Sequence, residues 1–235
     1  MPNYSKPQSE TEPPASPLVA IDLVLMTLEQ GSLCVMMSDG HAEGVTQGAV
    51  LPGALVGMSE SLDEAARRVL RDRAYLTHID VEQFHAFGAV DRDPRKRSVS
   101  IGFLALVPYD RLEAAAAHDE HLLLAPIGFG EDGSYAGLNG LATGFDHADI
   151  IGRALERIRE KLNWSTISFG LLPEHFTLLE LQKVHEAILG RSLNKPAFRK
   201  RLLDAEFPGG LRLTATGQFT SGRAYRPAEL YQLKA

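Results

Sequence analysis

A short segment in the first third of the chain has the spacing of a divalent-cation site. Within residues 51–76, LPGALVGMSESLDEAARRVLRDRAYL, helical positions i, i+3 and i+4 share one face. Three carboxylates on such a face can hold a hard cation that activates water. Here the face carries Val69, Asp72 and Arg73. A guanidinium in a ligand position repels Mg²⁺ and can pair with Asp72. We therefore expect metal-dependent hydrolysis at this helix to be severely impaired.

This segment resembles the Nudix box, which reads Gly, five residues, Glu, seven residues, then Arg-Glu-U-x-Glu-Glu-x-Gly-U with U aliphatic. Alignment on Glu60 puts Ala54 at the first glycine, Arg68 at the arginine, and Val69, Asp72 and Arg73 at three carboxylates; four of the nine fixed positions match. The resemblance implies a Nudix-like domain with no catalytic residue, no metal ligand and no cofactor. Because Ala54 replaces a glycine that usually lets the backbone approach the ligand, the effector can differ from that of the family.

Three other interpretations remain open. The segment can be an amphipathic helix of an unrelated α+β domain, begun by the capping box of Ser61 and Glu64. It can belong to a working, unorthodox Nudix pyrophosphatase that uses Glu60, Glu64 and Asp72. The chain can also be an adaptor that binds other proteins and no effector.

A second group of candidate residues is basic and lies near the C-terminus. The whole chain has a net charge of −6, but from Leu171 onward it contains ten Lys and Arg against six Asp and Glu. A basic part therefore follows an acidic one. The basic side chains and hydroxyls that we expect to contact DNA are Lys195, Arg199, Lys200, Arg201, Thr220, Ser221, Arg223 and Arg226.

The elements expected around these cations follow the order of a winged helix. A capping box at Thr177 opens a helix that Gly190 ends, and a second helix starts near Pro196 and runs to about Ala205. Two short strands, 210–216 and 229–234, follow. Cations on the second helix suit insertion into a major groove, and the arginines and hydroxyls of the loop suit phosphate or the minor groove. A solvated basic surface is the alternative.

Residues 176–234 closely resemble the C-terminal domain of the Nudix-related transcriptional regulators, a family known for repressing NAD metabolism genes. The matching stretches include Phe176-Thr177-Leu178, His185-Glu186-Ala187-Ile188-Leu189-Gly190 and Arg226-Pro227-Ala228, and Asp91-Arg92-Asp93-Pro94-Arg95 and Phe145-Asp146-His147-Ala148 extend the likeness to the first part. The resemblance implies a homodimer, a palindromic operator in double-stranded DNA, and ADP-ribose or a related NAD metabolite as effector. The candidate effector-binding residues are Glu60, Arg68, Arg92 and Arg95.

The order of the helices and strands expected around residues 51–76 predicts an α+β fold. This fold has a Nudix-like mixed sheet with flanking helices, followed by a C-terminal winged helix-turn-helix domain. We expect a hairpin of residues 18–28 and 32–37, strands at 80–87 and 98–107, and a loop at 128–144. Helices are expected from Ser61 to about Tyr75, over 113–118 and over 147–162, the last capped by Asp146. The predicted domains are 18–165 and 174–235.

Composition places the chain among ordinary globular proteins. It has 235 residues, of which 44% are hydrophobic, and one cysteine, Cys34, which we expect to be buried. Residues 1–17 are rich in Pro, Ser and Glu and predict a disordered tail. No run approaches the ~20 apolar residues of a membrane span, so the expected location is the cytoplasm. The histidines show no metal-ligand pattern.

Overall fold

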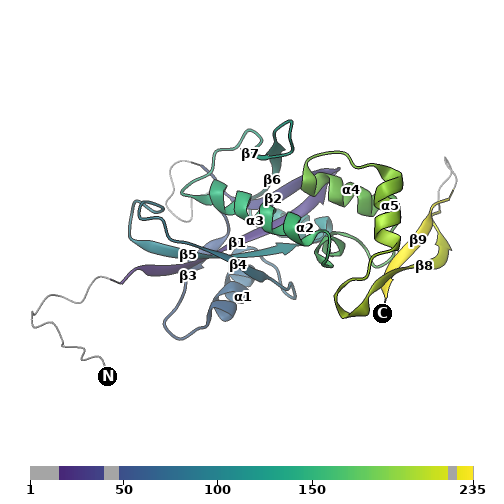
Figure 1. Cartoon of the computed structure of the whole chain (residues 1–235). Coiled ribbons are helices and arrows are strands. Elements are labelled where there is room, and N and C mark those ends of the chain that lie inside the picture. The colour runs from purple at the N-terminus through teal and green to yellow at the C-terminus, as the bar shows by residue number, and fades with distance from the viewer. Residues whose placement is uncertain (1–15, 40–47, 222–226, 235) are drawn as a thin grey trace, which may run out of the picture.

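The computed structural model describes residues 16–39, 48–221 and 227–234. The predicted tail therefore lies almost wholly outside the described residues, as do Arg223 and Arg226 of the expected wing. A mixed sheet with helices on both faces adjoins a smaller part built from two helices and a two-stranded wing (Figure 1). The predicted fold class is confirmed. In the described part of the chain, no helix has the length and apolar character to cross a membrane.

The seven-stranded sheet has the order β4-β5-β1-β2-β6-β7, with β3 paired to β1 as well. Its strands are β1 (Leu18–Glu29), β2 (Ser32–Ser38), β3 (Gly53–Leu55), β4 (Glu82–Phe87), β5 (Ser98–Leu106), β6 (Leu122–Phe129) and β7 (Tyr135–Leu138). The pair β1 and β5 is parallel, whereas the other pairs are antiparallel. The predicted first hairpin is confirmed, and Gln30 and Gly31 both take positive φ, of 48° and 89°. Such turns match the twist of the strands that they join.

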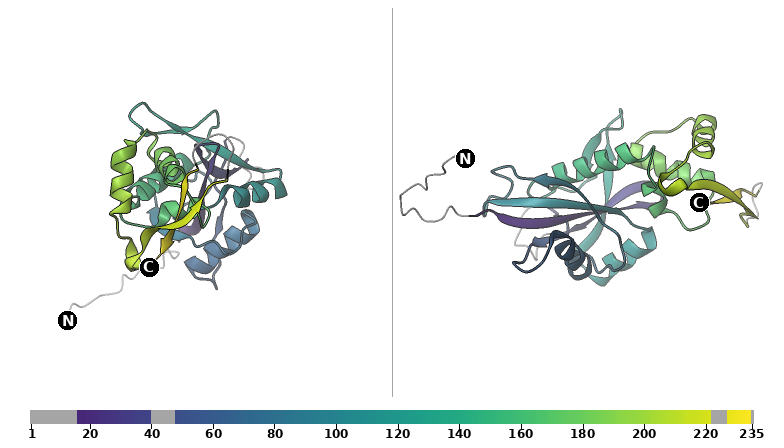
Figure 2. Two further views of the ribbon diagram at one scale, coloured as in Figure 1. Left: turned by 90° about the vertical axis from the view of Figure 1, so that its right-hand side faces the viewer. Right: turned by 60° about the horizontal axis from the view of Figure 1, so that its bottom comes forward.

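Both faces of the sheet are covered, which explains the continuous apolar run of β1. Ile21, Leu23 and Leu25 point into a core beneath α1 (Leu62–Arg73) and α2 (Tyr109–His118). Val24 and Met26, in alternation with them, point into a core beneath α3 (His147–Lys161). The right-hand view of Figure 2 shows α3 on one side of the sheet and α1 and α2 on the other.

Two elements differ from the expectations. The glycine-rich stretch 128–144, predicted as a loop, contains the end of β6 and all of β7, so that prediction is wrong. Strand β7 pairs with β6 in a short hairpin, with Phe129 opposite Tyr135, and Gly133 takes a positive φ of 80° in the turn between them, so these glycines serve a hairpin turn and not a continuous loop. The helix expected at 113–118 begins four residues earlier, at Tyr109.

The C-terminal part has the predicted order of helix, turn, helix and wing. It contains α4 (Leu178–Leu189), α5 (Lys195–Leu203), β8 (Arg212–Phe219) and β9 (Glu229–Lys234), preceded by the 3-10 turn η2 (Ile167–Leu171), with a second, η3 (Pro208–Gly210), before β8. The capping box at Thr177 is present, and Gly190 ends α4 with φ 66°. Asn194, which the sequence analysis did not single out, caps α5 through its side chain. The core of this part is Phe176, Leu181, Phe198, Leu202, Phe207, Leu213 and Tyr231.

Helix α4 joins the two parts because it contributes to two cores. Leu181 packs in the C-terminal core, whereas Val184 and Ile188 pack in the sheet core beneath α3. Arg159 of α3 adds a polar contact, since its Nε donates to the carbonyl of Ile188 at 2.9 Å. The winged helix is therefore packed directly on the sheet domain.

Candidate functional site

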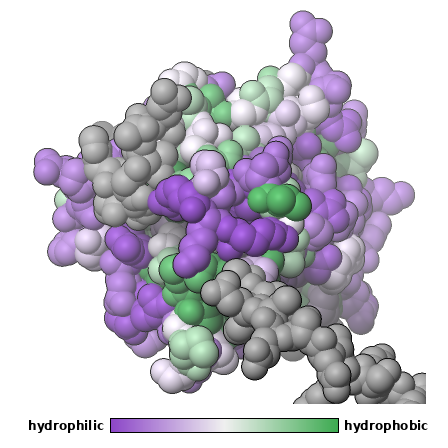
Figure 3. All heavy atoms as spheres, turned by 90° about the vertical axis from the view of Figure 1, so that its left-hand side faces the viewer, coloured by the Kyte–Doolittle hydropathy of each residue, from purple (hydrophilic) through white to green (hydrophobic). Residues whose placement is uncertain are grey.

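A cavity of about 450 Å³ opens beside the first residues of β1. We call it the β1 cavity. The lining is formed by β1, β3 and the residues before it, the last residue of α1, the loop between β4 and β5, the start of β5, and the residues that lead into and start α3. The lining residues are Leu18, Ala20, Asp22, Val50, Leu51, Gly53, Ala54, Leu55, Arg73, Arg92, Asp93, Arg95, Lys96, Ser98, Phe145 and His147. Figure 3 looks onto the end of the molecule where β1 begins, and hydrophilic side chains with small hydrophobic patches between them cover that face. Both apolar walls and charged groups are thus available to a ligand.

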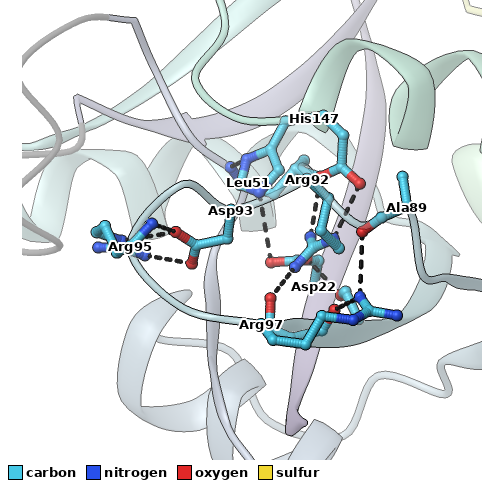
Figure 4. Close-up of polar contacts among 11 residues, drawn as sticks. Asp22, Leu51, Ala89, Arg92, Asp93, Arg95, Arg97 and His147 are labelled. Atoms are coloured by element: carbon cyan, nitrogen blue, oxygen red, sulfur yellow. Dashed lines mark hydrogen bonds and ion pairs between the residues drawn. The ribbon is translucent and has the colours of Figure 1, made fainter.

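Arg92 is the centre of a buried ion-pair network at this cavity (Figure 4). Its Nε and Nη2 donate to the two carboxylate oxygens of Asp146 at 2.9 Å each, and its Nη1 donates to Ser98 Oγ at 3.0 Å. Nη2 also lies 3.4 Å from Asp22 Oδ2. Only 5% of the Arg92 side chain is exposed, so most of its donors are committed to the protein itself.

Asp146 precedes α3 but does not cap it in the predicted way. It occupies the N-cap position without a side-chain hydrogen bond to the helix, because both of its oxygens accept from Arg92. The next residue, His147, is buried and accepts at Nδ1 from the backbone N–H of Leu51 at 2.8 Å. Its Nε2 faces Asp22 Oδ1 at 3.7 Å. Strand β1 and the start of α3 are therefore linked through charges.

Arg95 forms a more exposed part of the cavity wall. It binds both oxygens of Asp93 at 2.9 to 3.0 Å, and its guanidinium lies 4.6 Å from the ring centroid of Phe145. The hydrogen bonds from Arg95 hold the pKa of Asp93 below its usual range. An arginine stacked on an aromatic ring presents a flat cationic surface that suits a nucleotide base or a phosphate.

The pair of Glu60 and Arg68 lies outside the described lining of the cavity. Arg68 donates to Glu60 through Nη2 at 2.6 Å and Nε at 2.9 Å, and to the carbonyl of Leu55 at 2.9 Å. Glu60 also accepts from the backbone N–H of Gly57 at 2.6 Å. The hydrogen bonds from Arg68 and Gly57 lower the pKa of Glu60 to about 2. This pair fixes the turn between β3 and α1.

The other acids of the box are also engaged. Glu64 accepts from the backbone N–H and hydroxyl of Ser61 at 2.7 and 2.8 Å, which completes the predicted capping box. Asp72 is bound by its neighbour Arg71 at 2.7 Å, where the sequence analysis expected Arg73. Within the described residues, no group of three or more His, Cys, Asp or Glu is arranged to hold a metal ion.

Several cavity residues were not chosen from the sequence. Asp22, Asp93, Phe145 and His147 line the cavity, as does Arg73, which the alignment marked only as a lost ligand position. A signal was present for Asp22, because it is a lone acid in the apolar run of β1. The run Phe145-Asp146-His147 was noted, but only as part of a family pattern.

Of the residues predicted to contact DNA, those that the structure describes lie on α5 and just after the end of the first wing strand. Lys195, Arg199 and Lys200 are exposed on α5. Arg201 is exposed too, but its Nη1 donates to Asn163 Oδ1 at 3.1 Å and its guanidinium stacks 5.5 Å from the Phe198 ring. On the wing, Thr220 Oγ1 accepts from the N–H of Ala228 at 3.0 Å and the neighbouring Ser221 is exposed.

Known proteins resemble this chain in both parts. Residues 168–233 match the family model described as the NrtR DNA-binding winged helix domain. The ADPR responsive transcriptional repressor NtrR of Acinetobacter baylyi is 29% identical over 219 residues, or 92% of this chain and 82% of that protein. The crystal structure of Shewanella oneidensis NrtR complexed with a 27mer DNA has a TM-score of 0.73 at 29% identity, with 92% of this chain and 93% of that chain covered. A MutT/nudix family protein from Enterococcus faecalis shares the fold, with a TM-score of 0.71 at 21% identity over 97% of this chain and 90% of that one.

Proposed function

From its place in the Nudix-related transcriptional regulator family, with a winged helix of NrtR type, we propose that this chain is a DNA-binding repressor whose Nudix-like domain senses ADP-ribose or a related NAD metabolite and controls NAD-related genes. The observation that carries the proposal is the basic winged helix packed through α4 on a Nudix-type sheet. A ligand of the sheet domain can influence the winged helix through this shared packing.

For the operator complex, we propose that α5 enters the major groove. Lys195, Arg199 and Lys200 are exposed and can reach bases and phosphates, with Arg199 also interacting with Tyr231. Arg201 is held toward Asn163 and acts beside the groove. Thr220 and Ser221 contact the sugar-phosphate backbone of the DNA. Arg223 and Arg226, which lie outside the described residues, are proposed to contact it as well. A homodimer places two such helices on a palindromic site.

For the effector, we propose the β1 cavity, whose volume of about 450 Å³ is in the range of small-molecule sites. Arg95 and Phe145 offer a cationic and aromatic wall, and Arg92, which is buried and bound by Asp146 and Ser98, holds that wall in place. Glu60 and Arg68 contribute by fixing the turn that leads to the cavity. The effector acts by binding one arrangement of the two winged helices more tightly than another.

We propose that the domain does not hydrolyse its effector. The acids that a pyrophosphatase would use are bound within the protein, Glu60 by Arg68, Glu64 by Ser61 and Asp72 by Arg71. Incubation of the chain with ADP-ribose and Mg²⁺ or Mn²⁺ should release no AMP. Turnover that disappears in Glu60→Gln would show instead that the chain is an unorthodox Nudix enzyme.

A shift assay tests the regulatory proposal directly. DNA from upstream of the gene for this protein and its neighbours should be retarded by the chain, with an affinity that falls steeply as salt rises. Addition of ADP-ribose should change that affinity. An adaptor that binds only proteins would give no salt-dependent retardation, and an effector-free repressor would give retardation that ADP-ribose leaves unchanged.

A further inference from the structure

The last turn of α1 places an arginine at the cavity where a Nudix hydrolase has a metal ligand. Val69 is fully buried beneath the helix, and Asp72 is held at the surface by Arg71. Arg73, the last residue of α1, lines the β1 cavity. Among the described residues that line the cavity, Arg73 is therefore the one from these three aligned positions. It carries a permanent positive charge where a Nudix hydrolase has a carboxylate.

The carboxylates of the cavity do not fit a divalent cation. Asp22 accepts from Ser100 Oγ at 2.5 Å and is ion-paired with Arg92, and Asp93 accepts from Arg95. Mg²⁺ demands near-octahedral oxygen ligands, with carboxylates to offset its charge. The acids of this cavity are each neutralised by an arginine, and no metal-holding group of acids is found among the described residues.

The charges of the cavity lining fit a diphosphate instead. The lining contains Arg73, Arg92, Arg95 and Lys96 against Asp22 and Asp93, and with Asp146, which accepts from Arg92, the surplus is one positive charge. A diphosphate that joins two sugars, as in ADP-ribose, has two negative charges. Guanidinium groups bind phosphate oxygens through paired hydrogen bonds whose geometry needs no bridging metal.

We infer that Arg73 supplies, for the diphosphate of the effector, the positive charge that a divalent cation supplies in a Nudix hydrolase, so that the effector binds without metal. This inference rests on the proposed function, because it takes the β1 cavity as the effector site. The inference also explains how a cavity of the Nudix type can bind the effector without hydrolysing it. A guanidinium neutralises phosphate but does not lower the pKa of a bound water as a metal does.

Isothermal titration of the full chain with ADP-ribose tests the inference. The dissociation constant in EDTA should equal that in excess Mg²⁺. Arg73→Glu in EDTA should weaken binding by about tenfold to a hundredfold, the range for a lost charged hydrogen bond. Mg²⁺ should then recover part of the loss, because the substitution restores a carboxylate at the ligand position. Arg73→Ala should be weakened without recovery.

Arg67→Glu is the matched control, since Arg67 is exposed on the same helix outside the described lining and undergoes the same change of charge. Its affinity should remain near that of the unsubstituted chain. Binding by the unsubstituted chain that is lost in EDTA would overturn this inference alone, and so would full affinity in Arg73→Glu. Absence of binding with and without metal would overturn the effector assignment itself.

Discussion

The sheet domain and the winged helix use arginine in opposite ways. In the sheet domain, Arg92 is buried and satisfied by Asp22 and Asp146. In the winged helix, every lysine and arginine among the described residues is exposed, Arg199 and Lys200 of α5 included. The difference teaches that the count of basic residues in a region does not tell which of them can meet a partner. Burial and pairing decide this.

Helix α4 shows that the two parts are nevertheless one packed unit. Its buried residues are divided between the sheet core, with Val184 and Ile188, and the C-terminal core, with Leu181. A change at the start of α3 can reach α4 through this shared core. The buried Arg92 of the sheet domain and the exposed cations of α5 therefore belong to one packed structure. Substitutions can compare their effects on stability and on DNA binding.

The largest effect is expected from Arg92→Met. The substitution leaves Asp22 and Asp146 without their cation in a buried site, and breaking a buried ion pair from one side costs roughly 3–5 kcal/mol. The free energy of unfolding, measured by urea titration at pH 7, should fall by about this amount. Arg153→Met is the control, because Arg153 forms an exposed pair with Glu156 that contributes about 0–1 kcal/mol. Equal small losses in both variants would contradict the structural role of Arg92.

The second prediction concerns the surface cations. Arg199→Ala should weaken operator binding by roughly 1–3 kcal/mol if this side chain reads a base. The same substitution should leave the melting temperature nearly unchanged, in contrast to Arg92→Met. A shift titration measures the affinity, and Arg153→Ala on α3 of the sheet domain serves as control. Unchanged DNA binding in Arg199→Ala would remove this arginine from the groove.

The same contrast explains what the sequence reveals. The capping boxes at Ser61 and Thr177, the turn at Gln30 and Gly31 and the end of α4 at Gly190 were predicted correctly, because each depends on residues within one turn of the chain. The exposed side chains of α5 follow from the same local periodicity. Local signals are thus enough for the starts and ends of these helices and for the first turn of the sheet.

The cavity could be predicted only in part, because its contacts span the chain. Arg92 meets Asp146 across 54 residues and Asp22 across 70. Arg92 and Arg95 were predicted as ligand contacts, but no local pattern indicates that Arg92 is buried. The alignment marks Arg73 as a lost metal ligand, but nothing in the sequence shows that this residue lines the cavity. These facts depend on how β1, the loop before β5 and α3 meet.

A third prediction compares the two capping boxes, which have the same geometry in different surroundings. Ser61→Ala and Thr177→Ala should each lower the free energy of unfolding by about 1 kcal/mol. The loss should be larger for Thr177, because it is buried and starts the helix that both cores share. Thermal denaturation measures both losses. Ser61→Thr and Thr177→Ser keep the hydroxyl and should keep most of the stability, so an equal loss in Thr177→Ser and Thr177→Ala would show that packing matters more than the cap.

The smallest effect at neutral pH is expected from His185, the titratable group that lies against α5. His185 is buried, its Nε2 lies 3.2 Å from Ser168 Oγ, and its ring packs edge-on against Phe198. Burial, with a smaller contribution from Arg201, lowers the pKa of His185 to about 4. The unfolded chain takes up this proton near pH 6.5, whereas the folded chain does so only near pH 4.

Stability should therefore fall as the pH decreases from about 6.5 toward about 4, with little change above that window. In His185→Gln, urea titrations across this window should show a weaker dependence on pH. His175→Gln is the control, because His175 is exposed just before Phe176, and it should retain the pH dependence of the unsubstituted chain. If His185→Gln retained it in full, the acid sensitivity would come from other groups, such as Asp93, whose pKa the hydrogen bonds from Arg95 lower, and the assignment to His185 would be wrong.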